Sequence, residues 1–132
     1  MSGGVRERGG VQRAIGNNAD AMDARLRHRR PDPAAFHYGP GHLIVHGNST
    51  FLDEFGPACL GQPAREALVD LPSEAFELMD RVYDGGKPLA RRIRTANGFR
   101  RLVVAPRSDP ETGLTYGVAS HIRSIAVVRH AG

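Results

Sequence analysis

The dipeptide Asn97-Gly98 lies between two segments of alternating character, and it constrains the fold of this chain more than any other feature. An Asn-Gly pair in this setting is a strong signal of a β-hairpin, because Asn and Gly tolerate the positive φ angles of a tight turn. We therefore predict that residues 87–96 and 99–106 are antiparallel strands. A further long strand, at residues 114–122, follows a turn-rich segment and extends the same sheet.

The turn also determines which side chains share a face of the sheet. With Asn97-Gly98 as the two turn residues, the predicted pairs are Thr95 with Arg100, Arg94 with Arg101, and Ile93 with Leu102. One face is then apolar and should face a core: Leu89, Ile93, Leu102 and Val104. The other face carries arginines, and like charges opposed across a hairpin are destabilising unless water screens them or an acidic partner neutralises them. A solvated face and a docking face both fit this pattern.

Residues 73–84 have the clearest helical pattern in the chain. Ser73 is a favoured N-cap residue, and Gly85-Gly86 supplies a left-handed stop after the last turn. One side of this helix is apolar: Phe76, Met79, Val82 and Tyr83. An apolar side needs a partner of matching size, so we expect this helix to pack on the predicted sheet.

The segment before this helix predicts a strand and two short helical pieces. Residues 43–46 alternate as in a strand, residues 48–54 form a helical turn with Phe51 and Phe55 on one side, and residues 64–69 form a second helical piece. Two histidines, His42 and His46, would lie about 13 Å apart along the strand, which is too far for one metal ion. We interpret them as surface or edge residues.

The N-terminal region has a different character. Residues 1–17 contain five glycines and no periodicity, which predicts a disordered leader. Residues 18–40 predict a helix with a thin apolar stripe, which includes Met22 and Leu26, followed by a proline-rich linker. The stripe is too thin for the helix to stand alone, so it needs another surface or a second copy. The folded domain is expected to occupy residues 41–132.

The order and spacing of these motifs resemble those of a PAS domain over residues 41–123. The matching residues are Asn48, Phe51, Phe55-Gly56, Gly61-Gln62-Pro63, Leu71-Pro72, Gly86-Lys87-Pro88, Gly98-Phe99-Arg100, Ala105-Pro106 and Tyr116-Gly117-Val118. The resemblance implies an α+β fold, in which a five-stranded antiparallel sheet with helices on one face encloses a small pocket. It also implies a role in sensing a ligand, light or redox state, or in dimerisation and docking within a signalling system.

A pocket in such a fold would be lined by one group of side chains: Asn48, Phe51, Phe55, Met79, Tyr83, Ile93, Leu102, Val104 and Ala119. A solid core without a cavity is the alternative, in which Asn48 only caps a turn. Haem-binding PAS domains usually present a histidine on the long helix, and residues 73–84 contain none. Cys59 lacks the surroundings of the reactive cysteine of flavin photosensors, so we interpret it as a small apolar residue. The sequence does not indicate which cofactor, if any, the domain binds.

The sequence contains no motif of a known catalytic centre, so we predict a regulatory domain rather than an enzyme. It has no apolar run long enough to span a membrane, and its single cysteine excludes an internal disulfide and suits the cytoplasm. A homodimer or an unidentified signalling partner is expected to contact one group of residues: Arg92, Arg94, Arg101, Tyr116, Val118, Ile122, Met22 and Leu26. The alternative is a basic nucleic-acid-binding accessory protein, which would use the face of Arg92, Arg94 and Arg101 together with the basic N-terminal region. Residues 1–32 carry seven arginines and four acidic residues.

Overall fold

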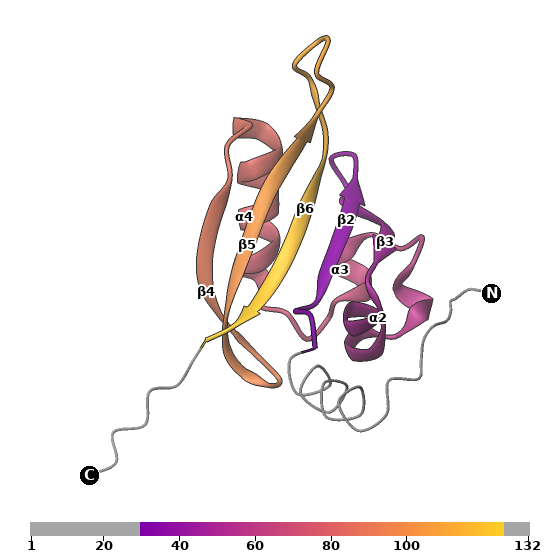
Figure 1. The fold of residues 1–132 in the computed structure, drawn as a ribbon, viewed down its shortest axis with the longest axis vertical. Coiled ribbons are helices and arrows are strands. Elements are labelled where there is room, and N and C mark those ends of the chain that lie inside the picture. The colour runs from indigo at the N-terminus through magenta and orange to yellow at the C-terminus, as the bar shows by residue number, and fades with distance from the viewer. Residues whose placement is uncertain (1–29, 126–132) are drawn as a thin grey trace, which may run out of the picture. The chain divides into compact units, whose positions relative to one another are not determined.

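The computed structural model describes residues 30–125, and its compact domain begins at Asp32. The predicted leader and N-terminal helix, with Met22 and Leu26, lie outside the described residues. In chain order the elements are β2 (Ala34–Tyr38), β3 (Leu43–Gly47), α2 (Ser49–Phe55), the 3₁₀ turn η1 (Pro57–Cys59), α3 (Ala64–Ala67), α4 (Ser73–Gly85), β4 (Leu89–Thr95), β5 (Gly98–Ser108) and β6 (Thr115–Ser124) (Figure 1).

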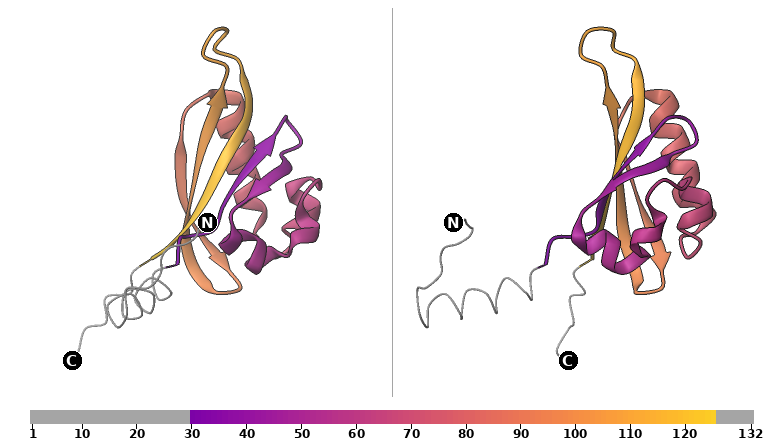
Figure 2. Two further views of the ribbon diagram at one scale, coloured as in Figure 1. Left: turned by 45° about the vertical axis from the view of Figure 1, so that its right-hand side comes forward. Right: turned by 90° about the vertical axis from the view of Figure 1, so that its right-hand side faces the viewer.

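The strands form one antiparallel sheet in the order β3-β2-β6-β5-β4. At its centre β2, the first strand of the domain, pairs with β6, the last (Figure 1). The helices gather on one side of this sheet, and α4 packs against β4, β5 and β6 (Figure 2). The predicted α+β architecture, a five-stranded antiparallel sheet with helices on one face, is confirmed. We call the side covered by the helices the helix side, and the opposite side the outer side.

The predicted linker is wrong for β2, and the sheet begins before residue 41. The two residues of β2 that are buried on the helix side are Ala35 and His37, and these do not produce the apolar alternation by which a strand is recognised. The segment is a strand because its backbone pairs on both edges, with β3 and with β6. β3 and β6 supply the hydrogen bonds that make β2 a strand, and these partners cannot be predicted from the sequence of β2 alone.

The hairpin between β4 and β5 exists as predicted, but its pairing is shifted by two residues. Thr95 lies opposite Gly98 and Ile93 opposite Arg100, so Ala96 and Asn97 form the turn. Neither Ala96 nor Asn97 has a positive φ, whereas Gly98, the first residue of β5, has a φ of 96°. The two-residue turn with Asn97-Gly98 at its centre would require positive φ at both. Because a shift of two preserves the pleat, the predicted core face of the hairpin is retained.

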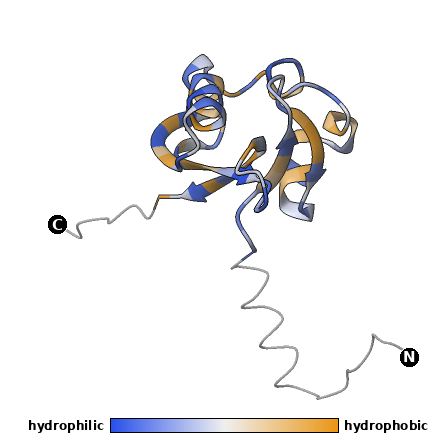
Figure 3. Cartoon of the chain, turned by 90° about the horizontal axis from the view of Figure 1, so that it is seen from above, coloured by the Kyte–Doolittle hydropathy of each residue, from blue (hydrophilic) through white to orange (hydrophobic). Residues whose placement is uncertain are grey.

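The long helix α4 also ends as predicted and starts slightly differently. Gly86 stops it in the left-handed conformation, with a φ of 70°. Its N-cap residue is Pro72, and no side chain caps the first turn, so the prediction that Ser73 is the cap is wrong. Apolar side chains of α4 are buried against the sheet: Ala75, Phe76, Leu78, Met79 and Val82. Figure 3, viewed from above the strands, shows the helical segments together on one side of the sheet.

Candidate interaction face

The strands β4, β5 and β6 contain seven arginines and no acidic residue. Since successive side chains of a strand point to opposite sides, the pleat divides these arginines between the two sides of the sheet. Arg91 and Arg100 lie opposite buried core residues and belong to the helix side. The other five belong to the outer side: Arg92, Arg94, Arg101, Arg107 and Arg123.

Each helix-side arginine pairs with a carboxylate of a helix. The buried Arg100 forms a two-pronged ion pair with Glu54 of α2, in which Nη1 donates to Oε1 at 2.9 Å and Nη2 donates to Oε2. Nε of Arg100 also donates to Oγ1 of Thr95 at 3.0 Å. Nη2 of Arg91 donates to Oε2 of Glu74, in the first turn of α4, at 3.0 Å. The helix-side charges are therefore neutralised within the domain.

The outer arginines form a different arrangement. Arg92 lies directly opposite Arg101, and Arg101 lies directly opposite Arg123, so three arginines form a row across β4, β5 and β6. We call these three residues the arginine row. Neighbouring strands are about 4.8 Å apart, so the row is roughly 10 Å long. All three residues are exposed, and no carboxylate among residues 30–125 forms an ion pair with them.

The row is unfavourable for the isolated domain, because like charges directly opposite each other destabilise a sheet by some tenths of a kcal/mol per pair. The predicted register places Arg94 opposite Arg101. The structure places Arg92 there and brings Arg123 to the other side of Arg101, so the positive charge is more concentrated than the sequence predicts.

Aromatic rings hold some of the outer arginines in place. The guanidinium carbon of Arg92 lies 4.3 Å from the ring centroid of Phe99, and that of Arg94 lies 5.2 Å from it. Arg107 lies 5.7 Å from the ring of Phe36 on β2. Cation–π contacts of this kind restrict the side chains while leaving their N–H donors available.

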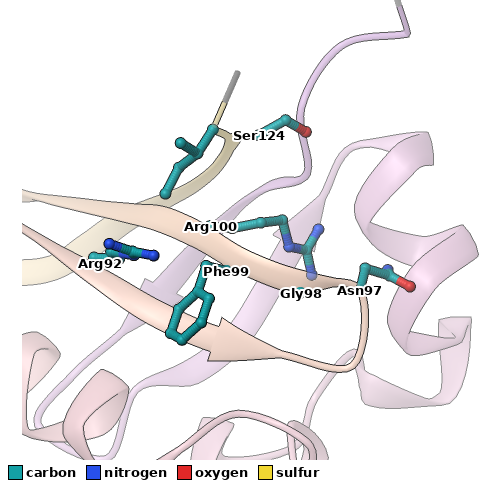
Figure 4. Close-up of a pocket in the computed structure, with 7 residues that line it drawn as sticks. Arg92, Asn97, Gly98, Phe99, Arg100 and Ser124 are labelled. Atoms are coloured by element: carbon teal, nitrogen blue, oxygen red, sulfur yellow. The ribbon is translucent and has the colours of Figure 1, made fainter. Parts of the chain in front are cut away.

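Two shallow hollows lie beside the row. One, of about 450 Å³, is lined by Arg92, Arg101, Arg123, Ser124 and Ile125. The other has a similar volume, of about 450 Å³. It shares Arg92, Ser124 and Ile125 with the first and extends to Phe99 at the hairpin (Figure 4). The row is thus accompanied by concave surface and by exposed apolar atoms.

The predicted docking residues divide between the two sides. Tyr116 lies on the outer side, where its ring meets that of Phe36 edge-on at 6.0 Å. Val118 and Ile122 are 0% and 1% exposed in the core, so the prediction that they dock a partner is wrong. The pairing of β5 and β6 is irregular near Tyr116, which is one extra residue on β6. Alternation cannot be followed through such a bulge, because the extra residue reverses the sides.

The predicted pocket residues lie mainly in the core. Five of them are fully buried between the sheet and the helices: Phe51, Met79, Ile93, Leu102 and Val104. Phe55 and Tyr83 are partly buried and pack against this cluster. These seven residues are brought together as predicted, and whether they bind a ligand stays a prediction.

The remaining two predicted pocket residues have other positions. Asn48 is the N-cap of α2: its Oδ1 accepts from the backbone N of Phe51 at 2.9 Å and of Ala34 at 3.1 Å, and its Nδ2 donates to the carbonyl of Asp32 at 2.9 Å. It therefore ties α2 to the start of β2. Ala119 lies opposite Phe36 on the outer side, so its placement in the pocket is wrong.

Two buried histidines lie where β2 connects to β3: His37 is on β2, and His42 is the last residue of the turn. His37 is fully buried, and its Nε2 lies 2.7 Å from Oγ of Ser120 on β6. His42 is 2% exposed, and its Nε2 donates to Oδ1 of Asp80 on α4 at 2.6 Å. Oδ2 of the same carboxylate accepts from Arg65 at 2.9 Å. The interpretation of His42 as a surface residue is therefore wrong, because the turn, with a φ of 56° at His42, directs it inward.

The burial of these imidazoles has an electrostatic consequence. Burial and, to a smaller extent, the nearby charge of His42 lower the pKa of His37 from 6.5 to about 4. The Nδ1 atoms of both rings are buried without a hydrogen-bond partner. His37 is therefore neutral at physiological pH.

The other reactive side chain, Cys59, is buried in η1. Burial raises the pKa of its thiol, so the nucleophilic thiolate is disfavoured at neutral pH. Among residues 30–125, no group of three His, Cys, Asp or Glu side chains is placed to hold a metal ion. Within the same range, no helix has the length and apolar character needed to cross a bilayer.

No protein-family model matches the sequence, and no curated protein matches it either. The solved structures that are similar to the chain include three domains of sensory proteins. The PAS domain of the histidine kinase ThkA has a TM-score of 0.60 and 18% identity, and the match covers 72% of this chain and 100% of that one. A sensory box sensor histidine kinase from Vibrio cholerae has a TM-score of 0.68 and 12% identity, covering 83% of this chain and 94% of that one. The PAS domain of BvgS from Bordetella pertussis has a TM-score of 0.60 and 20% identity, covering 85% and 90%.

The domain has the PAS fold. The predicted resemblance is confirmed at the level of the fold, and at these identities the similarity extends no further. The arginine row must therefore be interpreted from its own residues. The sequence contains a partial signal for the row. Arg123 lies near the end of a strand that pairs with the strand of Arg101, and only a few registers of that pairing are possible.

Proposed function

We propose that this chain is a non-catalytic PAS-type sensory and interaction domain of a signalling or transcription-regulating system, and that it acts by binding another protein on the outer side of its sheet. The arginine row carries the proposal. It is exposed, it lacks carboxylate partners among the described residues, and it costs stability in the isolated domain. A partner that neutralises the row would recover that cost.

The fold supports a signalling role. Similar PAS domains belong to histidine kinases, as with ThkA. The outer side supports a role in binding, because no helix of residues 30–125 packs on it (Figure 2). Its exposed aromatic and arginine side chains are of the types that are enriched in protein interfaces.

Photo-crosslinking in the cells that produce the chain tests this proposal. Phe99, which is 46% exposed beside the row, is replaced by a benzophenone amino acid of similar shape. The matched control carries the same amino acid at Glu77, which is exposed on α4. We expect an adduct of higher mass from position 99 and none from position 77. Adducts from position 77 alone, or from neither position, would refute the proposal.

A second role, the binding of a small polar molecule in the core, is favoured by one observation. The Nδ1 atoms of His37 and His42 are buried without partners, and such atoms are usually satisfied by a water or a ligand. Native mass spectrometry of the purified protein, with an absorption spectrum, tests this role. A co-purifying mass that is lost in the His37→Phe variant would support it, and the mass of the bare chain in both proteins would contradict it.

A further inference from the structure

We infer that the outer side of the sheet recognises an acidic helix of a partner protein, in which carboxylates on successive turns meet the arginine row. The inference rests on the proposed function and adds the chemistry of the partner. It starts from a difference between the arginines on the two sides of the sheet in whether they have acidic partners. Those on the helix side each have a glutamate, whereas the row has no acidic partner among residues 30–125.

A second copy of this domain is a poor occupant of the same surface when the two copies meet through their outer sides. The acidic residues of the domain lie mainly in its helical layer, where residues 49–85 contain eight acidic residues and two arginines. The strands that carry the row contain no acidic residue. Asp32 of the outer side already pairs with His121 at 3.3 Å. Two copies that met through their outer sides would therefore set arginine against arginine, which repels.

The rest of this chain is also a poor occupant. Residues 1–31, before the domain, contain seven arginines and three acidic residues, so their net charge has the same sign as the row. Residues 126–132, after it, contain one arginine and no acidic residue. The charge of the row is thus complemented by a different protein.

The spacing of the row favours a helix over an extended strand. Its three arginines occupy neighbouring strands at intervals of about 4.8 Å, or roughly 10 Å in total. An α-helix that lies across the strands presents a side chain every turn, at intervals of about 5.4 Å. An extended segment presents side chains on one face every two residues, at about 6.6 Å. Over two intervals, the span of the helix exceeds the length of the row by about 1 Å, and the span of the extended segment exceeds it by about 3 Å. Arginine side chains are long enough to adjust to the smaller difference.

The neighbouring surface indicates the rest of the partner's helix. Phe99 is 46% exposed and Ile125 is 39% exposed, and both line hollows that border the row. An amphipathic helix with glutamates at positions i, i+4 and i+7, and with leucines beside them, would place carboxylates on the guanidinium groups and apolar side chains in these hollows.

Fluorescence anisotropy with the full chain tests the inference. The probe is a stapled 18-residue helical peptide with this pattern of glutamate and leucine, and the comparison peptide has glutamine in place of each glutamate. At low salt we expect the glutamate peptide to bind at least about tenfold more tightly, which corresponds to about 1.4 kcal/mol. This advantage should shrink at high salt, because salt screens exposed charges.

Matched variants locate the binding. R92Q/R101Q removes two charges of the row, and R81Q/K87Q removes two exposed charges elsewhere. We expect the first variant to lose about tenfold in affinity for the glutamate peptide and the second to stay within about twofold of the unaltered chain. Circular dichroism checks that both variants are folded, and R92Q/R101Q should be no less stable, because the substitutions relieve repulsion within the row.

The inference would be overturned if the two peptides bound with equal affinity or if neither bound. It would also be overturned if both variants lost equal affinity for the glutamate peptide, or if the chain bound an 18-base-pair DNA duplex more tightly than this peptide. The last result would favour a nucleic-acid partner. The inference can also fail while the proposed function stands. That is the case if the crosslink from position 99 captures a protein through a segment without carboxylates.

Discussion

Lowering the pH from 7 to 5 should destabilise the domain through one buried side chain, His37. Its pKa is about 4 in the folded protein and near the ordinary value of 6.5 in the unfolded chain, so between these values the unfolded chain binds more protons. The stability that neutral His37 contributes is complete above pH 6.5 and is lost as the pH falls toward 4. Linkage with these two pKa values gives a loss of about 2 kcal/mol between pH 7 and pH 5.

Urea unfolding followed by circular dichroism measures this effect in the unaltered chain and in the His37→Gln variant. Glutamine does not titrate, and it keeps a polar end that reaches toward Ser120, the neighbour of His37. All other titratable groups are the same in both proteins, so the difference between the two curves isolates His37. We expect the stability advantage of the unaltered chain over the variant to fall by about 2 kcal/mol between pH 7 and pH 5. With a urea dependence of about 1–3 kcal/mol per molar, that is a shift of roughly 0.7–2 M in the midpoint.

Parallel pH dependences in the two proteins would refute this reasoning, since they would mean that His37 is not kept neutral by burial. A nuclear magnetic resonance titration of the His37 ring gives an independent check. The ring signals should stay those of neutral imidazole down to about pH 4, and a transition near pH 6.5 would contradict the structure.

Three further substitutions test the contacts that position the sheet, each by urea unfolding. Glu54→Gln leaves the buried charge of Arg100 without its partner and should lower the free energy of unfolding by about 3–5 kcal/mol. Glu74→Gln breaks a more exposed pair and should lower it by less than about 1 kcal/mol. Equal losses would contradict the assignment of the first pair as buried. Gly117→Ala places a Cβ 2.2 Å from the carbonyl oxygen of His37 and should lower the free energy of unfolding by about 1–3 kcal/mol. In the control, Gly85→Ala, the new Cβ meets no atom within 4 Å, so the substitution should be neutral or stabilising. Asn48→Ala removes the cap of α2 and should cost about 1–2 kcal/mol; an unchanged midpoint would show that the cap contributes nothing.

Much of the fold is predictable from local pattern, and its centre is not. The hairpin, the long helix and the cap at Asn48 each have a signal within a few residues, and the structure contains all three. The central strand β2 lacks such a signal, because its inward residues are Ala35 and His37 and its pairing partners are distant in the sequence. It is a strand because of β6, which local reasoning does not include.

The same limit explains what was missed at the candidate site. The positive charge of β4 and β5 is evident in the sequence, but the row depends on register, which the conformation of Gly98 and the pairing with Arg123 decide. The core position of His42 depends on an inward-directed turn. In both cases the residue types are visible in the sequence, and their neighbours are known only when the strands are paired.

The pairing of β2 with β6 has a consequence for how the protein is made. Ala34 and His121, its partner in the sheet, are 87 positions apart in the sequence. Until Thr115–Ser124 leaves the ribosome, the β2–β3 pair and the β4–β5 hairpin have no strand between them, and each presents an unpaired edge. The sheet is therefore completed only after β6 has been synthesised, in a step that closes a long loop. Nascent chains arrested before Thr115 should be the form of this protein that most needs a chaperone.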